Sequence, residues 1–363
     1  MSLQSKSPAT QYSEQPLGNS LLTQSQVQEI LSSLNDQPLN GPLAELHRWS
    51  QRVGYFNHLN QPNEYFEFPD HEYKVPLKLQ LNYSRLGYQK PNHPSLPKCP
   101  LCYENIGAPG KELLRVFEFT LLGVPYFAHL TPFPLHPGHF VVNKRTHSPM
   151  QVNGESLACA AEFISKTNGY LLASNSDIEW AGASVLAHQH FQVFSALQLP
   201  IQKAKALTRG STNGVLWEVL RWPSLAVRLQ GSKQQLTEFS AAFLERWKSL
   251  APSFSTANYL LNRVANEFTL ILTLRHSAYR TQAPTTQLKA EGVGVIEMCG
   301  EAILPPKPSL TREENNHYFN TIGLQLIRSI ISQNSPTPKA LTVDWLTELI
   351  TKSSTQDLFN PFC

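Results

Sequence analysis

Hydrophobic and polar residues alternate in many short segments of the chain, and this two-residue period is typical of half-buried strands. Some of these segments come in pairs separated by a turn, as at residues 112–119 and 123–130, which predicts antiparallel hairpins. The predicted strands cover residues 112–119, 123–130, 140–142, 169–174, 188–194, 214–230, 258–264, 267–274, 292–297 and 301–304.

Apolar residues at helical spacing predict the remaining regular structure. Two helices are predicted within residues 21–53, and further helices cover residues 155–167, 234–250, 310–333 and 340–352. The stretch between the first helices and the first strands, residues 54–98, is rich in tyrosine, asparagine and proline. Its lack of periodicity predicts an irregular covering segment. Residues 1–20 are polar and predict a flexible tail without a signal-peptide core.

A faint internal repeat accompanies this order of elements. A hairpin that ends in Lys144-Arg145-Thr146-His147 is followed by a predicted helix, and a second hairpin ends in Arg275-His276 before further helices. Only the first copy is followed by a group of histidines.

Composition limits the classes of function. The 363 residues, of which 41% are hydrophobic, suffice for one large or two medium domains, and the net charge of +3 is too small to indicate a nucleic-acid surface. No apolar run is long enough to span a bilayer, so we expect no membrane partner. From the small net charge we expect no nucleic-acid partner. The odd number of five cysteines, without a signal peptide, predicts reduced thiols and a cytoplasmic protein.

The densest chemistry lies in the segment that begins with Gly182-Ala183-Ser184 and continues through His188, His190 and Gln192. Because side chains alternate along a strand, the last three share one face. Such a pair of histidines is often a solvated polar face, but the flanking apolar residues favour burial, and a buried histidine needs a partner. A neutral imidazole is a nucleophile or a metal ligand, and the small residues allow backbone amides to approach a phosphate.

Cys99 and Cys102 form a Cys-x-x-Cys motif, which is typical of a metal half-site or a redox pair. The redox alternative favours a βαβ setting that the surrounding pattern lacks. Two buried thiols without a metal are the third interpretation.

Taken in order, these motifs resemble the histidine-triad superfamily. The resemblance rests on Cys99-x-x-Cys102, Pro137-Gly138-His139 with the strand after it, His147, Gly182-Ala183-Ser184 and His188-x-His190-x-Gln192. With a glutamine at the third triad position, the chain resembles the transferase branch of this superfamily. That branch includes galactose-1-phosphate uridylyltransferase, the dinucleoside tetraphosphate phosphorylases and GDP-L-galactose phosphorylase. The resemblance covers about residues 95–305.

The family implies an α+β fold of two tandem histidine-triad-like units, each an antiparallel sheet with packed helices, which agrees with the faint repeat. The predicted division is a tail at 1–20, a helical and irregular extension at 21–95, a first unit with the active site at 96–212, and a degenerate second unit with the C-terminal helices at 213–363.

The resemblance also implies roles for individual residues. His190 is the expected nucleophile, and Gln192 is expected to hydrogen-bond a phosphate oxygen, since a neutral amide is no general acid. This pattern favours transfer or phosphorolysis over hydrolysis. The implied substrate contacts are Gly182, Ser184, Asn175, Lys144 and Arg275.

A structural Zn²⁺ ion is the implied cofactor, held by Cys99, Cys102, His147 and His188. The extra residue before His147 leaves His136 and His139 as alternative ligands. They lie in the Pro-rich turn upstream of it.

The resulting functional prediction is a nucleotidyltransferase or phosphorylase that acts on a nucleoside diphosphate hexose through a nucleotidyl-histidine intermediate. Its partners are the nucleotide sugar, a phosphate or sugar-phosphate acceptor, and a second copy of the chain in a possible homodimer. The alternatives are a dinucleoside polyphosphate phosphorylase, a histidine-triad hydrolase, or a catalytically silent nucleotide-binding protein.

Overall fold

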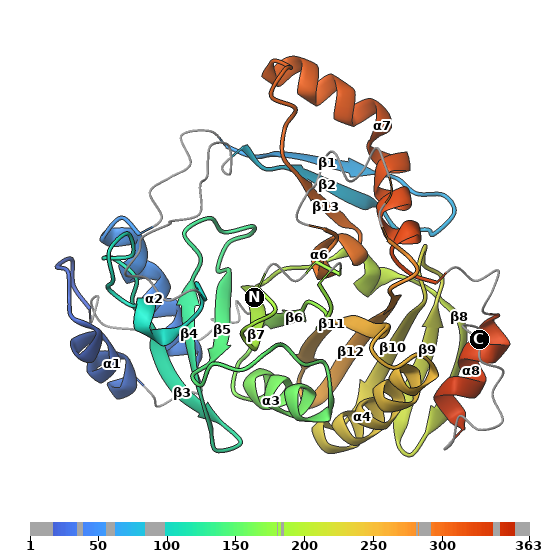
Figure 1. The fold of residues 1–363 in the computed structure, drawn as a ribbon, viewed down its shortest axis with the longest axis horizontal. Helices are drawn as coiled ribbons and strands as arrows, with labels where there is room; N and C mark the ends of the chain where they lie inside the picture. The colour runs from blue at the N-terminus through green and yellow to red at the C-terminus, as the bar shows by residue number, and fades with distance from the viewer. Residues whose placement is uncertain are drawn as a thin grey trace, which may run out of the picture.

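A computed structural model describes residues 17–34, 39–55, 62–83, 99–179, 181–182, 185–280, 282, 292–336 and 342–352. These residues form one ten-stranded sheet and one three-stranded sheet with helices packed on them (Figure 1). The strands are β1 Glu64–Phe68, β2 Leu77–Leu81, β3 Phe117–Leu121, β4 Val124–Leu130, β5 Phe140–Lys144, β6 Tyr170–Ser174, β7 His190–Ser195, β8 Ala206–Thr212, β9 Val215–Leu220, β10 Ala226–Gly231, β11 Ser255–Val264, β12 Glu267–His276 and β13 Glu301–Leu304. The helices are α1 Gln24–Ser33, α2 Asn40–Arg52, α3 Gly154–Ser165, α4 Lys233–Leu250, α6 Val295–Met298, α7 Arg312–Gln333 and α8 Val343–Thr351.

The large sheet consists of two halves with the same topology. Its order is β3-β4-β5-β7-β6-β11-β12-β10-β9-β8, and every neighbouring pair is antiparallel. From the outer edge of the sheet inward, the strands are β3-β4-β5-β7-β6 in the first half and β8-β9-β10-β12-β11 in the second. In chain order, each half therefore places its fifth strand between its third and its fourth. In both halves a long helix, α3 or α4, connects the third strand to the fourth. The predicted α+β class with tandem units of antiparallel sheet and helix is therefore confirmed.

Local signals explain where the two connecting helices begin. The Asn153 side chain accepts a hydrogen bond from the Ser156 amide, and the Asn153 backbone amide donates one to the Ser156 hydroxyl oxygen. Ser232 caps α4 in the same way through the Gln235 amide. These caps satisfy amide groups that the first turn leaves without helical partners. In Figure 1, α3 and α4 lie beside each other across the middle of the large sheet.

The two faces of the sheet bury different cores. Phe140, Val142, Phe191 and Val193 alternate onto the face covered by the helices, and they belong to the larger apolar cluster. Leu171 and Phe194 point to the opposite face and belong to the smaller cluster, together with residues of the three-stranded sheet, α6 and α7. Phe194 shares its strand face with His190 and Gln192. The face opposite the long helices is therefore the one that carries the predicted chemistry.

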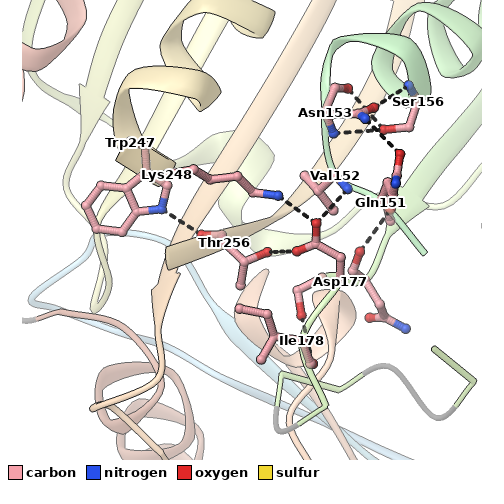
Figure 2. A network of polar contacts seen from close by, with 12 residues as sticks. Gln151, Val152, Asn153, Ser156, Asp177, Ile178, Trp247, Lys248 and Thr256 are labelled. Atoms are coloured by element: carbon pink, nitrogen blue, oxygen red, sulfur yellow. Dashed lines mark hydrogen bonds and ion pairs between the residues drawn. The ribbon is translucent and has the colours of Figure 1, made fainter. Parts of the chain in front are cut away.

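Asp177, just after β6, joins the two halves near their junction (Figure 2). Its Oδ2 accepts hydrogen bonds from the Val152 amide at 2.9 Å and from Lys248 Nζ at 2.6 Å, while its Oδ1 accepts one from Thr256 Oγ1 at 2.5 Å. The carboxylate thus connects the entry to α3 in the first half with α4 and β11 in the second. Such charge-assisted bonds fix the relative position of the elements.

Several elements differ from the prediction. The stretch 54–98, expected to be irregular, contains β1 and β2, which pair with each other, and β2 also pairs with β13 from the far end of the chain. Within the predicted strand 292–297 the helix α6 begins at Val295. Strand β7 begins at His190, so His188 precedes it. The predicted unit boundaries remain a prediction, although β8, placed before the boundary at 213, pairs with β9 of the second half. Residues 1–16 and 84–98 lie outside the described residues.

Among the helices of the described ranges, none has both the length and the apolar character needed to cross a bilayer.

Candidate active site and metal cluster

Cys99, Cys102, His147 and His188 come together in one cluster. One ligand atom from each lies within 4.8 Å of all the others. The Cys102 Sγ atom is 3.2 Å from His147 Nδ1 and 3.6 Å from His188 Nδ1, and Cys99 Sγ is 3.5 Å from His188 Nδ1. The residues come from a turn before β3, the end of β5 and the approach to β7. Two thiols and two imidazoles are a donor set that suits tetrahedral Zn²⁺. The cluster can hold a metal ion.

Backbone contacts orient these donors. His188 Nε2 lies 2.7 Å from the Lys144 carbonyl oxygen. A carbonyl only accepts, so Nε2 carries the hydrogen and the Nδ1 lone pair faces the sulfur atoms. The Asn105 amide donates to the carbonyl oxygens of Cys99 and Cys102 at 2.9 and 3.1 Å, which shapes the cysteine turn. Burial, followed by the hydrogen bond with Cys99, raises the pKa of the Cys102 thiol to about 12. A metal ion that binds here therefore displaces a proton.

His190 is buried at the start of β7, and its tautomer follows from one contact. Its Nδ1 lies 2.8 Å from the carbonyl oxygen of His188, which can only accept. Nδ1 therefore carries the hydrogen, and Nε2 keeps a lone pair. Burial lowers the pKa of His190 to about 4, so the ring is neutral near pH 7. A neutral imidazole with an available Nε2 is competent as a nucleophile. The backbone link also couples His190 to the ligand His188.

Polar side chains surround His190 on the same sheet face. Asn143 on β5 is its direct cross-strand partner, and Gln192 lies two residues further along β7, opposite Val141. On the neighbouring strand β4, His129 faces the same side, and its Nδ1 lies 2.8 Å from the Leu130 carbonyl oxygen. The face thus presents imidazole nitrogens and neutral amides.

The Lys144 side chain does not lie on this face, and its predicted contact with a substrate remains a prediction. Along β5, Val141 and Asn143 point to the histidine side, and the alternation directs Lys144 to the helix side. There its Nζ lies 3.6 Å from Glu155 of α3. Lys144 contributes to the site through its backbone, as the acceptor for His188.

Gly182, from the predicted phosphate-binding segment, has a structural role in the described residues, and its contact with a substrate remains a prediction. Gly182 has φ +83°, and a Cβ atom placed there would lie 2.2 Å from the Cα atom of Gly294. Glycine is required here because the backbone at this position lies very close to the backbone of the segment before α6. Asn175, another predicted substrate contact, accepts a hydrogen bond from the Val295 amide at 2.9 Å through Oδ1. Both residues support that junction, and Ser184 lies outside the described residues.

Arg275 is fully buried, and its predicted contact with a substrate remains a prediction. Its guanidinium group donates hydrogen bonds to Asn258 Oδ1 at 2.7 Å, the Val293 carbonyl at 3.0 Å and Asn334 Oδ1 at 3.1 Å. Burial lowers its pKa to about 9. Arg275 fastens β12 to the C-terminal segment.

The alternative metal ligands lie elsewhere. His136 Nε2 is 2.9 Å from Glu301 Oε1 on β13, and the His139 ring stacks on Phe194 with 4.4 Å between ring centroids. Both histidines connect the turn before β5 to the smaller core. Of the three histidines considered for this position, His147 is the one that joins His188 and the cysteines.

Sequence reasoning missed Asn143 and His129. The alternation of residues along β4 and β5 is visible in the sequence. Which of these residues lie on the same sheet face as His190 follows only from the pairing of β4, β5 and β7. No short motif marks either residue.

Comparisons with known proteins show which enzymes the chain resembles. No family model matches the chain. It is 27% identical over 243 residues to the galactose-1-phosphate uridylyltransferase of Halalkalibacterium halodurans, covering 58% of this chain and 47% of that protein. The enzyme of the same name from Caldanaerobacter subterraneus subsp. tengcongensis is 25% identical over 302 residues, covering 71% of this chain and 56% of that protein. The resemblance to the transferase branch of the histidine-triad superfamily is confirmed. The chain nevertheless spans only about half the length of these curated relatives.

Solved structures support the fold of this branch. The yeast Ap4A phosphorylase in complex with AMP aligns with a TM-score of 0.57 at 13% sequence identity, covering 83% of this chain and 97% of that one. The same enzyme in complex with Ap4A gives a TM-score of 0.57 as well. At this identity the likeness concerns the fold alone.

Proposed function

We propose that the chain is a nucleotidyltransferase that acts on a nucleoside diphosphate hexose through a covalent nucleotidyl-His190 intermediate. The observation that carries this proposal is the hydrogen bond of 2.8 Å from His190 Nδ1 to the His188 carbonyl oxygen. It fixes the tautomer in which Nε2 bears the lone pair, in a buried ring whose pKa is lowered to about 4. The nucleophile therefore needs no base to remove a proton at neutral pH.

The chemistry takes two balanced steps. First, the Nε2 lone pair forms a bond to the α-phosphorus, and the bond from that phosphorus to the bridging oxygen breaks. The electron pair leaves with a hexose 1-phosphate anion. In the second step a phosphate oxygen of the acceptor bonds to the same phosphorus, and the N–P bond returns its electron pair to Nε2. Two such substitutions are ordinary covalent catalysis.

Gln192 suits this reaction because the leaving group is already a stable anion. A neutral amide donates a hydrogen bond to a non-bridging oxygen without supplying a proton. Gln192 is partly exposed on the same strand face as His190, where a substrate can reach it. The names of the relatives, galactose-1-phosphate uridylyltransferase, support a hexose 1-phosphate as one substrate.

The metal cluster is proposed to hold a structural Zn²⁺ ion. All four protein donors are present, so a bound ion has a closed coordination sphere and supplies rigidity rather than Lewis-acid chemistry. By fixing His188, it fixes the carbonyl group that holds His190. We also infer a reducing, cytoplasmic setting from the free thiols of Cys99, Cys102, Cys159 and Cys299.

The test is intact-mass spectrometry of the protein mixed separately with UDP-glucose and GDP-glucose, without an acceptor. The proposal predicts a covalent increase of one nucleoside monophosphate, carried by the peptide that contains His190. His190→Ala is expected to remain unlabelled, whereas His317→Ala, which removes an exposed histidine of α7, is expected to be labelled like the wild type.

Adding orthophosphate or galactose 1-phosphate to the labelled protein then separates phosphorolysis from hexose-phosphate transfer. Labelling of His190→Ala, or no labelling of the wild type by either sugar nucleotide, would contradict the proposal.

A further inference from the structure

Asn143 is a buried amide without a partner in the described part of the chain. Its side chain is fully inaccessible, and neither Oδ1 nor Nδ2 makes a hydrogen bond there. A buried polar group that loses water without gaining a partner destabilises the folded state. Such a group calls for a specific explanation, and a ligand absent from the structure is one.

The strand pairing places this amide beside the nucleophile. Asn143 on β5 and His190 on β7 are direct partners in an antiparallel pair. The flanking hydrogen bond runs from the Lys144 amide to the Gln189 carbonyl at 3.0 Å, which makes Asn143 and His190 a non-hydrogen-bonded pair. In such pairs the two side chains come closest, with Cβ atoms about 4.5 to 5.5 Å apart.

The neighbours limit what Asn143 can do. On its other side its cross-strand partner is Phe127, which offers no hydrogen-bonding group. The His190 tautomer is already fixed by the His188 carbonyl, so the amide is not needed for that purpose. His190 Nε2 carries no hydrogen, so Asn143 Oδ1 has nothing to accept from it. The Nδ2 hydrogens remain available for an acceptor that arrives at Nε2.

We propose that Asn143 binds the phosphoryl group that is transferred to His190. This inference rests on the proposed function. Asn143 Nδ2 donates a hydrogen bond to a non-bridging oxygen of the α-phosphate, and Gln192 donates to another from further along β7. The group that bonds to Nε2 is then held by two neutral amides. No proton moves between Asn143 and the substrate.

The test compares substitutions that remove the donor. Asn143→Leu keeps a similar volume, and Asn143→Ala cannot clash. The proposal predicts that adduct formation from the sugar nucleotide that labels the wild type slows by about 100-fold or more in both variants, the loss typical of one transition-state donor. It also predicts that urea-induced unfolding of the ligand-free Asn143→Leu protein occurs at the same or a higher urea concentration, because an unpaired amide is removed.

Asn315→Leu is the matched control. Asn315 is equally buried in α7, but its side chain accepts a hydrogen bond from the Lys307 amide and donates to backbone carbonyls. This variant is expected to lose stability while its adduct forms at the wild-type rate.

Two results would overturn the role of Asn143 while leaving the proposed function intact. One is adduct formation at the wild-type rate in both Asn143 variants. The other is a loss of folding in both, which gives Asn143 a structural role. If the wild-type protein itself forms no adduct with UDP-glucose or GDP-glucose, the proposed function fails, and this inference fails with it.

Discussion

His129 lies on the same sheet face as His190 and offers a quantitative test of how strongly burial on that face disfavours a charged imidazole. Its ring is buried on β4, lies 6.2 Å from the Phe127 ring and donates from Nδ1 to the Leu130 carbonyl oxygen. Burial lowers its pKa from 6.5 to about 4, against the opposing effect of that hydrogen bond. The folded protein therefore holds His129 neutral, whereas the unfolded chain protonates it below about pH 6.5.

The sign and size follow from proton linkage. Because the folded pKa is below the unfolded one, the unfolded state binds more protons between pH 6.5 and pH 4, so stability falls as the pH falls through this window. One pKa unit is about 1.4 kcal/mol, which gives a loss of about 2 to 3 kcal/mol by pH 4.5 from this residue alone. At pH 7 and above the loss is absent.

The assay is urea denaturation of wild type and His129→Phe between pH 7.5 and pH 4.5. Phenylalanine keeps the aromatic contact, and the Leu130 carbonyl retains its hydrogen bond from the Tyr55 hydroxyl group. The variant lacks the titrating group, so its stability relative to wild type is expected to rise by about 2 to 3 kcal/mol as the pH falls. His317→Phe, at an exposed position, controls for the loss of a histidine as such. Parallel pH curves for wild type and His129→Phe would refute the reasoning.

Three further predictions concern the cysteine–histidine cluster, the Gln192 amide and the backbone at Gly182. A Cys99→Ser, Cys102→Ser double variant is expected to purify without zinc and to lose much of its stability, since structural zinc contributes roughly 10 kcal/mol or more to folding; equal metal content by elemental analysis would contradict this. Gln192→Ala is expected to slow transfer about 100- to 1000-fold in single-turnover kinetics while His190 still takes up label. Gly182→Ala is expected to destabilise far more than Gly123→Ala in urea titrations, because both have positive φ but only the first would place a Cβ 2.2 Å from the opposing backbone; similar losses would show that the close approach is unimportant.

The sequence was sufficient for features that depend on local pattern. Alternation predicted most strands of the large sheet, and helical spacing predicted α3 and α4, because one face of each element is buried against the core. The resemblance also selected Cys99, Cys102, His147 and His188 as a ligand set, and these four residues do meet.

Features that depend on pairing between distant segments could not be read from the chain. The short strands β1 and β2 pair with each other, and β2 is also held by β13 from the far end of the sequence, a parallel pairing that no local pattern indicates. Gly182 suggested a phosphate loop, but its reason is the backbone of Gly294. Asn143 became visible as a neighbour of His190 only through the register of β5 and β7. The face on which Lys144 lies follows from the same register, because alternation along β5 directs its side chain to the helix side of the sheet.

The central claim is that His190 attacks through Nε2 because its Nδ1 hydrogen is held by the His188 carbonyl oxygen. NMR spectroscopy of protein labelled with ¹⁵N-histidine tests it most directly, after reaction with the sugar nucleotide that labels the wild type. The account predicts a phosphorus signal coupled to one ring nitrogen, Nε2 of His190, and its absence in His190→Ala. Coupling to Nδ1, or to a nitrogen of another histidine, would contradict the account.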